Sequence, residues 1–264
     1  MGEIIFGLQA GVDVSVYAKS KFNEKQMKEI RLGLEDGLDV SIYAKSKYSH
    51  FQMSNIRFAL LKNVDYTKLI DEDFSPNQMD QILNGLMQDI DVSVYAKKDY
   101  GDKQMDEIRL GLEDNLDVSY YADPVYNWAQ MKQIRLGLED NLNVSLYVKP
   151  EFNNYQMREI RLGLKKELDI SIYAKSEFNY RQMETIREGL ESNVDVSIYA
   201  KKEYNFMQMQ EILTGLFTKV DVSIYANPDL DYEQMREIRN ETYKDYYDDY
   251  IRKICLLYTS PSPR

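Results

Sequence analysis

The hydrophobic and polar residues of this chain recur with a period of 26 residues. The pair Gln-Met at 26–27 returns at the same interval through 234–235, and an isoleucine follows three residues after each methionine. The segment Asp-Val-Ser-x-Tyr-Ala, or a close variant of it, recurs in the same register from Asp13 onward, without insertion or deletion. A fixed period of this kind predicts a solenoid, in which each unit buries its apolar face only by stacking on its neighbours.

The second half of each unit predicts an α-helix, which runs from about residue 24 to 36 in the first complete unit. Met27, Ile30 and Leu34 stand at i, i+3 and i+7, so their side chains share one helical face. The opposite face is polar, as expected of a helix that covers a core.

The residues at the predicted helix start have the pattern of a capping box. Asn23 is a favourable N-cap, and Gln26 stands three residues later, where its side chain can reach back to the N-cap backbone. In another unit Ser75 is the cap and Pro76 occupies the first helical position. The constant glutamine is therefore interpreted as a residue that closes the helix start.

A constant glycine inside the predicted helix indicates a close approach. Gly33 recurs in register although glycine costs up to about 1 kcal/mol relative to alanine in a helix. The one substitution is Ala59, so we expect a steric limit set by a neighbouring helix. The helix is predicted to end at a residue that tolerates the left-handed conformation, followed by an apolar residue. These end residues include Gly37, Asn115, Asn141 and Asn193.

The first half of the unit is open to two interpretations. Residues 39–44 are compatible with a short helix capped by Asp39, or with a strand of alternating apolar residues. The strand would give a βα solenoid of the leucine-rich-repeat type. The short helix is favoured because Lys68 would be costly in a strand-packed core, and because proline follows the segment in several units, as at Pro124. The expected fold is therefore an all-α solenoid of short helix–turn–helix repeats.

The expected organisation follows from this register. Residues 1–240 form the array, with a half repeat and nine units of which the last is incomplete, and 241–254 are expected to form a capping or exit helix. The unit at 63–88 diverges most, with Leu69 where other units have tyrosine. Residues 255–264 resemble translated sequencing-adapter read-through and are expected to be a non-native tail.

The string Gln-Met-Lys-Glu-Ile-Arg-Leu-Gly-Leu-Glu-Asp-Gly-Leu-Asp-Val-Ser-Ile-Tyr-Ala at 26–44 resembles tandem repeats of uncharacterised bacterial and mobile-element proteins. The resemblance covers about residues 3–241. It implies a repeat array and carries no function that can be transferred.

Composition narrows the expected partners. The formal net charge is −11, with 44% hydrophobic and 29% charged residues, which is typical of a folded soluble protein. The acidic balance argues against nucleic acid as a partner, and no apolar run of about 18 residues suggests a membrane span. The N-terminus lacks the features of a secretory signal, and the single cysteine, Cys255, lies in the expected tail, so we expect a cytoplasmic protein.

The residues expected of an enzyme are missing from the sequence. The one histidine, His50, stands at a variable position, and no phosphate-binding loop, metal-protease or calcium-loop motif occurs. The recurring aspartate, as at Asp39, is better explained as a helix cap than as a calcium ligand. We therefore expect no catalysis, no metal site and no cofactor.

A column of arginines is the first candidate for binding. These residues could line a groove for anionic groups, or they could form ion pairs between repeats with the recurring acidic residues; the ion pairs are favoured. The column comprises Arg31, Arg57, Arg109, Arg135, Arg161, Arg187 and Arg239.

Aromatic residues at variable positions are the second candidate. In solenoids the constant positions hold the stack and the variable ones face partners, and exposed aromatics suit protein interfaces. The alternative is that they staple the preceding loop onto the helix. They are Phe51, Trp128, Tyr155, Tyr180, Phe206 and Tyr232, in the first turn of the longer helix. The expected function is a scaffold that binds a protein partner; the alternatives are a structural spacer, or a ligand-sequestering inhibitor from a mobile element.

Overall fold

The structure is a computed structural model that describes residues 2–70 and 74–259. Within these ranges the chain contains α-helices and 3₁₀ turns and no strand, which confirms the all-α solenoid; the βα alternative was wrong for this part of the chain. The chain divides into two compact units, Met1–Glu139 and Asp140–Arg264, and each is described by itself.

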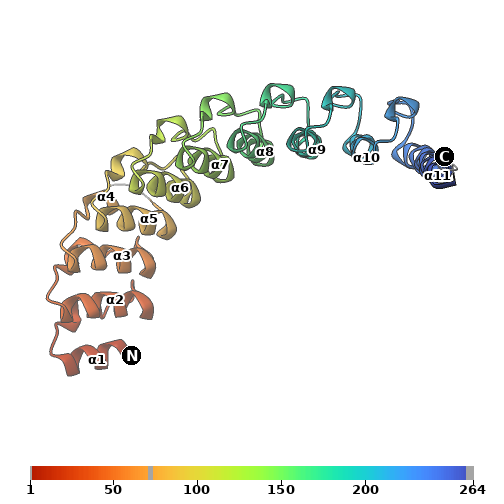
Figure 1. Cartoon of the computed structure of the whole chain (residues 1–264). Helices are drawn as coiled ribbons and strands as arrows, with labels where there is room; N and C mark the ends of the chain where they lie inside the picture. Colours follow the sequence, from red (N-terminus) through yellow and green to blue (C-terminus); the bar gives the residue numbers. More distant parts are fainter. Residues whose placement is uncertain (1, 71–73, 260–264) are drawn as a thin grey trace. The chain divides into compact units, whose positions relative to one another are not determined.

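The first unit alternates long helices with short turns (Figure 1), and successive long helices pack on one another. Its long helices are α1 (Gly2–Ala10), α2 (Glu24–Glu35), α3 (His50–Leu61), α5 (Pro76–Met87), α6 (Asp102–Glu113) and α7 (Trp128–Glu139). Its short elements are η1 (Val14–Val16), η2 (Val40–Ile42), α4 (Thr67–Ile70), η3 (Val92–Val94) and η4 (Val118–Tyr120).

The second unit repeats the same alternation, and its long helices again pack on their sequence neighbours. Its long helices are α8 (Asn154–Lys165), α9 (Tyr180–Glu191), α10 (Phe206–Phe217) and α11 (Tyr232–Thr259). Its short elements are η5 (Val144–Leu146), η6 (Ile170–Ile172), η7 (Val196–Ile198) and η8 (Val222–Ile224).

The helix starts are built as the sequence predicts. The Asn23 Oδ1 atom accepts a hydrogen bond from the Gln26 backbone N–H at 3.0 Å, and the Gln26 Oε1 atom accepts one from the Asn23 backbone N–H at 2.9 Å. Ser75 and Gln78 make the same capping box, with Pro76 at the start of α5. Two backbone N–H groups that have no partner within the helix are thereby satisfied at both of these starts, whereas at α6 the N-cap is Gly101 and only the glutamine bond is made.

The helix ends also follow the prediction. Gly37 has a φ of 72°, and the Leu38 N–H donates to the Gly33 carbonyl at 2.8 Å, which completes a left-handed Schellman end. Asn115, Asn141 and Asn193 have φ values of 56° at the equivalent position. The same conformation occurs at residues for which it is less favourable, Glu167 and Lys219, with φ values of 57° and 59°.

The short element is a single 3₁₀ turn in most units rather than a longer helix. Asp39 caps η2 by accepting a hydrogen bond from the Ser41 N–H at 3.0 Å. The tyrosine after the turn is fully buried, and the hydroxyl of Tyr43 donates to the Glu29 carbonyl of α2 at 3.2 Å. The turn therefore docks on the preceding long helix through one aromatic side chain.

The last long helix continues beyond the repeat. The expected exit segment 241–254 lies inside α11, which runs without a break from Tyr232 to Thr259. Residues 255–259 of the expected tail are also helical, and 260–264 lie outside the described residues. No helix in the described part of the chain has both the length and the apolar character that crossing a membrane requires.

Candidate functional site

The six variable aromatics lie at the first or second residue of the long helices. Phe51 and Tyr155 are 60% and 54% exposed, and Trp128 is 41% exposed. Tyr180, Phe206 and Tyr232 are half-buried. Their side chains are thus more accessible than those of the repeat core.

In the second unit three helices bring such residues into a continuous series. The rings of Tyr155 and Tyr180 lie 5.0 Å apart between centroids, with their planes tilted by 33°. The Arg181 guanidinium lies 4.7 Å from the centroid of the Phe206 ring and 5.8 Å from that of Tyr180. We call Tyr155, Tyr180, Arg181 and Phe206 the aromatic ridge. Residues 25 or 26 positions apart in the chain thereby form one surface across the starts of α8, α9 and α10.

In the first unit the aromatic positions form separate features. The Lys103 ammonium lies 4.7 Å from the centroid of the Trp128 ring, beside a pocket of about 340 Å³ lined by Pro124 and Val125. The Phe51 and His50 rings lie 4.0 Å apart between centroids, with their planes tilted by 35°. No ring contact joins these two places in the described residues, so the ridge belongs to the second unit.

Another aromatic column, which the sequence interpretation missed, holds the loop onto the helix. It stands one residue before the N-cap, where a hydrophobic staple is expected, and its members are buried. They are Phe22, Tyr48, Phe74, Tyr100, Tyr126, Phe152, Phe178 and Tyr204. The signal was present, because this position is aromatic in all these units. These buried residues, two or three positions before the variable aromatics, therefore already staple the loop onto the helix.

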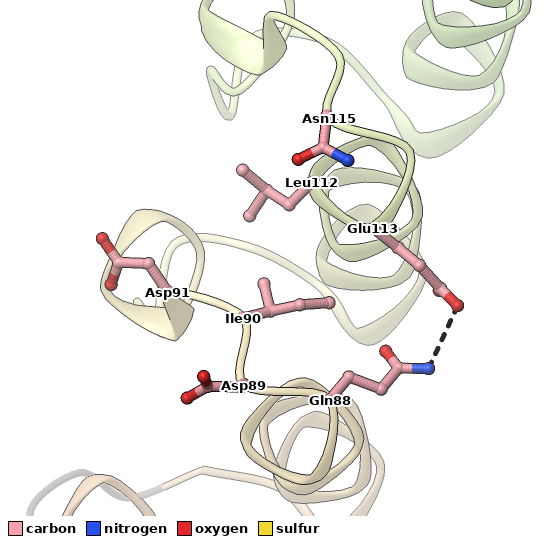
Figure 2. A pocket seen from close by; sticks show the side chains of 7 residues that line it. All are labelled: Gln88, Asp89, Ile90, Asp91, Leu112, Glu113 and Asn115. Atoms are coloured by element: carbon pink, nitrogen blue, oxygen red, sulfur yellow. Dashed lines mark hydrogen bonds between the residues drawn. The ribbon is translucent and has the colours of Figure 1, made fainter.

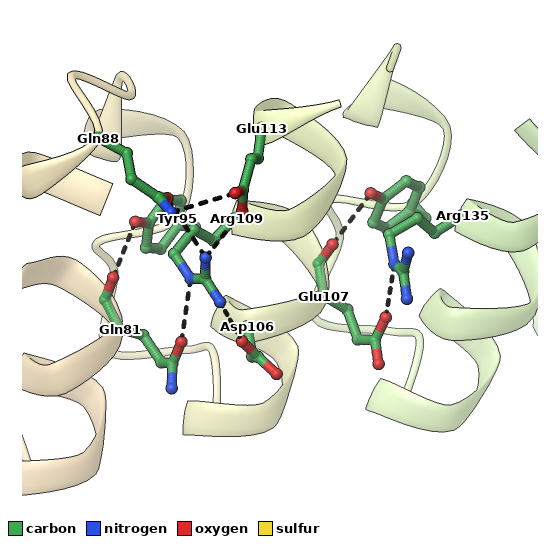
Figure 3. A network of polar contacts seen from close by, with 9 residues as sticks. Gln81, Gln88, Tyr95, Asp106, Glu107, Arg109, Glu113 and Arg135 are labelled. Atoms are coloured by element: carbon green, nitrogen blue, oxygen red, sulfur yellow. Dashed lines mark hydrogen bonds and ion pairs between the residues drawn. The ribbon is translucent and has the colours of Figure 1, made fainter. Parts of the chain in front are cut away.

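The arginine column lies in ion pairs. The Arg31 Nε atom lies 2.8 Å from the Glu3 Oε2 atom, and the Arg187 Nε atom lies 2.8 Å from that of Glu159. Arg135 binds Glu107 in the same way, as Figure 3 shows. Each of these pairs joins a helix to the one before it across 28 positions of the chain.

The remaining arginines of the column also have polar contacts. Arg57 pairs with Glu29, Arg161 with Asp140, and Arg239 with Glu211. Arg109 donates to the Gln81 side chain at 3.2 Å and pairs with Asp106 and Glu113 (Figure 3). An anion would have to compete with these groups for the guanidiniums. The anion groove stays a prediction, which retention on a heparin column at low salt would test.

The two units that lack this arginine also lack its acidic partner. Leu83 and Leu213 replace the arginine, and the residues 28 positions earlier are Asn55 and Thr185 rather than Glu or Gln. A leucine in place of the arginine would leave a buried carboxylate without a partner, which is costly. The arginine and the residue 28 positions earlier are replaced together. This indicates that the arginine column stabilises the packing of successive repeats.

The constant glutamine has a second partner besides the capping box. The Gln156 Nε2 atom donates to the Phe178 carbonyl, 22 residues on, at 2.7 Å. Gln26 and Gln182 make the same bond to the Tyr48 and Tyr204 carbonyls. Only an amide can both accept from the N-cap backbone and donate to the following loop, so glutamate does not substitute for it.

The pockets are open surface depressions. One of about 380 Å³ is lined by Asp89, Ile90 and Asp91 beside Leu112, and the Gln88 amide donates to Glu113 at 3.1 Å across its rim (Figure 2). No group of His, Cys, Asp or Glu in the described residues is arranged to hold a metal ion.

The strongest pKa shifts belong to the stack rather than to a pocket. Burial raises the pKa of Tyr225 to about 12, and it raises the pKa of Tyr43 further. Both hydroxyls donate to helix carbonyls, which accounts for their burial. A side-chain hydrogen bond from the neighbouring serine lowers the pKa of Asp39. These shifts follow from docking and capping, and they assign no acid–base role.

Comparisons with known proteins identify no relative. No family model matches the chain, and neither the curated proteins nor the solved structures that were compared contain a match. Any function must therefore be argued from the residues and their geometry.

Proposed function

We propose that this protein is a non-enzymatic repeat scaffold that binds a protein partner through the aromatic ridge. The observation that carries the proposal is the contact between Tyr155 and Tyr180, whose rings lie 5.0 Å apart while Tyr155 stays 54% exposed. Exposed aromatic side chains supply large contact area at a small entropic cost, and they dominate the energy of many protein interfaces. A cytoplasmic location belongs to the same proposal.

The division between constant and variable positions supports this assignment. The constant tyrosines, methionines and isoleucines are buried in the stack, except for the half-buried Met27 and Ile238. The first two residues of each long helix from α2 onward vary and stay at least partly accessible. A structural spacer needs only the constant positions. It does not require three successive helices to present aromatic side chains at one edge.

A peptide selection tests the proposal. Random peptides displayed on phage would be selected on the wild-type chain after depletion on the variant Tyr155→Ala/Tyr180→Ala/Phe206→Ala. We expect enriched peptides that bind the wild type and lose at least about ten-fold in affinity for the variant, a loss typical of removing interface anchors. If no such peptide is enriched, the spacer hypothesis is favoured instead.

Thermal unfolding tests whether the variable aromatics face a partner or staple the preceding loop onto the helix. If Phe206 and Trp128 face partners, each alanine variant should melt within a few degrees of the wild type, since surface substitutions usually change stability by about 0.5 kcal/mol or less. Phe178→Ala is the matched control, because its side chain is buried in the staple column. That variant should lose about 3 kcal/mol or more.

A further inference from the structure

We infer that the aromatic ridge recognises an extended acidic peptide, with a ligand carboxylate on Arg181 and apolar side chains on the flanking rings. This inference rests on the proposed function and names the chemistry of the partner. It depends on Arg181, whose surroundings differ from those of the arginine column.

Arg181 is exposed and its contacts are with aromatic groups. Its Nε atom donates to the Tyr180 hydroxyl at 3.1 Å, and its guanidinium lies 4.7 Å from the Phe206 ring centroid. No carboxylate lies within ion-pair distance of it in the part of the chain that the structure describes. Arg187, six residues on, instead pairs with Glu159, which is 1% exposed.

These contacts prepare the guanidinium to bind a carboxylate. A guanidinium that lies against aromatic rings keeps its N–H edge available, and that edge matches a carboxylate through two parallel hydrogen bonds. The Tyr180 hydroxyl occupies only the Nε donor. The two terminal nitrogens therefore remain for a ligand, and the rings on either side reduce the side-chain entropy that binding would cost.

The local charge also favours an acidic partner. The first five residues of α8, α9 and α10 contain Arg158, Arg181 and Glu184 as their charged residues, a small positive excess in a chain of net charge −11. Arg158 is 52% exposed, but its guanidinium pairs with the Glu159 carboxylate at 3.3 Å, so Arg181 is the cation of this edge that has no ion pair in the described residues. The unpaired guanidinium of Arg181 would therefore attract an acidic group of a partner to this edge.

The placement of the rings favours an extended ligand. The ridge side chains come from three successive helices, and packed helices lie about 8–10 Å apart. A polyproline II peptide rises about 3.1 Å per residue, so every third side chain advances by about one helix spacing. Apolar residues at a spacing of three can then meet successive rings, while an acidic residue between them reaches Arg181.

Fluorescence anisotropy with two labelled peptides tests the inference. The probes are (Leu-Glu-Pro)₄ and (Leu-Gln-Pro)₄, which share length and shape and differ in charge. We expect the wild type to bind the glutamate peptide about ten-fold more tightly than the glutamine peptide at low salt. The preference should shrink as the salt concentration is raised to about 1 M.

Two variants test whether Arg181 is the residue that causes the preference for the glutamate peptide. Arg181→Gln should reduce the ratio of affinities to about one and keep the binding of the glutamine peptide, with a circular dichroism melt to confirm folding. The matched control is Lys25→Gln, an exposed cation at the same position of α2 that is preceded by Glu24 rather than by an aromatic residue. That control should keep the ten-fold preference.

The outcomes distinguish the inference from the proposed function. Equal binding of both peptides by the wild type, or an unchanged preference in Arg181→Gln, would overturn acidic recognition. If phage-selected neutral peptides still require Tyr155 and Tyr180, the scaffold proposal stands without it. If neither probe binds, the inference is overturned, and the phage selection decides the scaffold proposal separately.

Discussion

The hydroxyl oxygen of Tyr43 lies 1.8 Å from the point where a Cβ atom on Gly33 would stand. The glycine therefore leaves the space through which the tyrosine reaches the Glu29 carbonyl of the same helix. The one unit with alanine at this position, Ala59, is also the one with leucine ten residues later, Leu69. A leucine lacks the hydroxyl, so Ala59 is compatible with Leu69, whereas an alanine opposite a tyrosine would clash with its hydroxyl.

Gly33→Ala should destabilise the array although alanine is the better helix former. The added methyl group displaces the Tyr43 hydroxyl, and the lost hydrogen bond and overpacking outweigh the helix propensity by about 2 kcal/mol. Adding Tyr43→Leu should recover at least about 1 kcal/mol of that loss. Urea unfolding of the wild type, both single variants and the double variant measures the coupling energy between positions 33 and 43. Strictly additive losses would contradict a steric clash between the added methyl group and the Tyr43 hydroxyl.

Gln156→Glu should cost about 3 kcal/mol, because a buried carboxylate would replace the amide that donates to the Phe178 carbonyl. Gln234→Glu is the matched control. Gln234 completes a capping box with Asp231 but is exposed, and it donates to no later loop within residues 2–70 and 74–259. Its replacement should change the free energy of unfolding by less than about 0.5 kcal/mol. Similar losses at both sites would show that capping alone explains the glutamine.

Arg187→Leu should destabilise the chain by about 3 kcal/mol, since it leaves the Glu159 carboxylate buried without its main partner. The double variant Glu159→Thr/Arg187→Leu copies the natural pair Thr185 and Leu213. It should unfold within about 1 kcal/mol of the wild type. Chemical denaturation of the wild type, the single variant and the double variant measures these differences. A double variant as unstable as Arg187→Leu would show that the unpaired Glu159 carboxylate is not the cause of the loss.

Glu167→Gly and Lys219→Gly should each stabilise the protein by about 0.5–1 kcal/mol, because both residues hold a left-handed backbone. The greater entropy of glycine in the unfolded chain offsets part of the gain. Asn115→Gly, with a similar φ, should gain less, since asparagine tolerates this region. Melting temperatures compare the three, and a loss of stability at Glu167 would mean that its side chain makes a contact of its own.

The capping aspartates should make the array sensitive to acid. The serine hydrogen bonds lower the pKa of Asp39, Asp195 and Asp221 in the folded state below the ordinary aspartate value of 3.8. The unfolded chain therefore binds protons first, and the stability present above that value is lost as the pH falls through the lowered folded pKa. Urea unfolding between about pH 2 and 5 should show a smaller slope for Asp195→Asn, for which Asn143 is a natural precedent. An unchanged slope would contradict the capping role.

Much of the fold could be predicted from the printed sequence. The start of α2 at Glu24 and its end before Gly37 follow from the capping box and the left-handed residue, which satisfy backbone groups within one turn of the helix. The short element was harder, because residues 39–44 suit a strand or a helix until it is known that Tyr43 docks on α2. The glycine column correctly predicted a close approach, but its expected cause, a neighbouring helix, was wrong: the side chains of Tyr43 and Val40, in and just after the following turn, fill the space.

The candidate site depended more on tertiary structure. The sequence placed Tyr155 and Tyr180 at helix starts, and it could not show that their rings meet or that Arg181 lies against Phe206. Likewise, the arginine column suggested ion pairs without naming partners 28 positions away.

The sequence by itself determined the period, the helices and their caps, since each of these follows from hydrogen bonds and side-chain spacing within a few residues. Only the tertiary structure decided which side chains face one another between repeats. That choice depends on the rotation and offset of each helix against the previous one, which the packing of Tyr43, Met53 and their equivalents sets. A repeating pattern is compatible with several such offsets, and the packed core selects one.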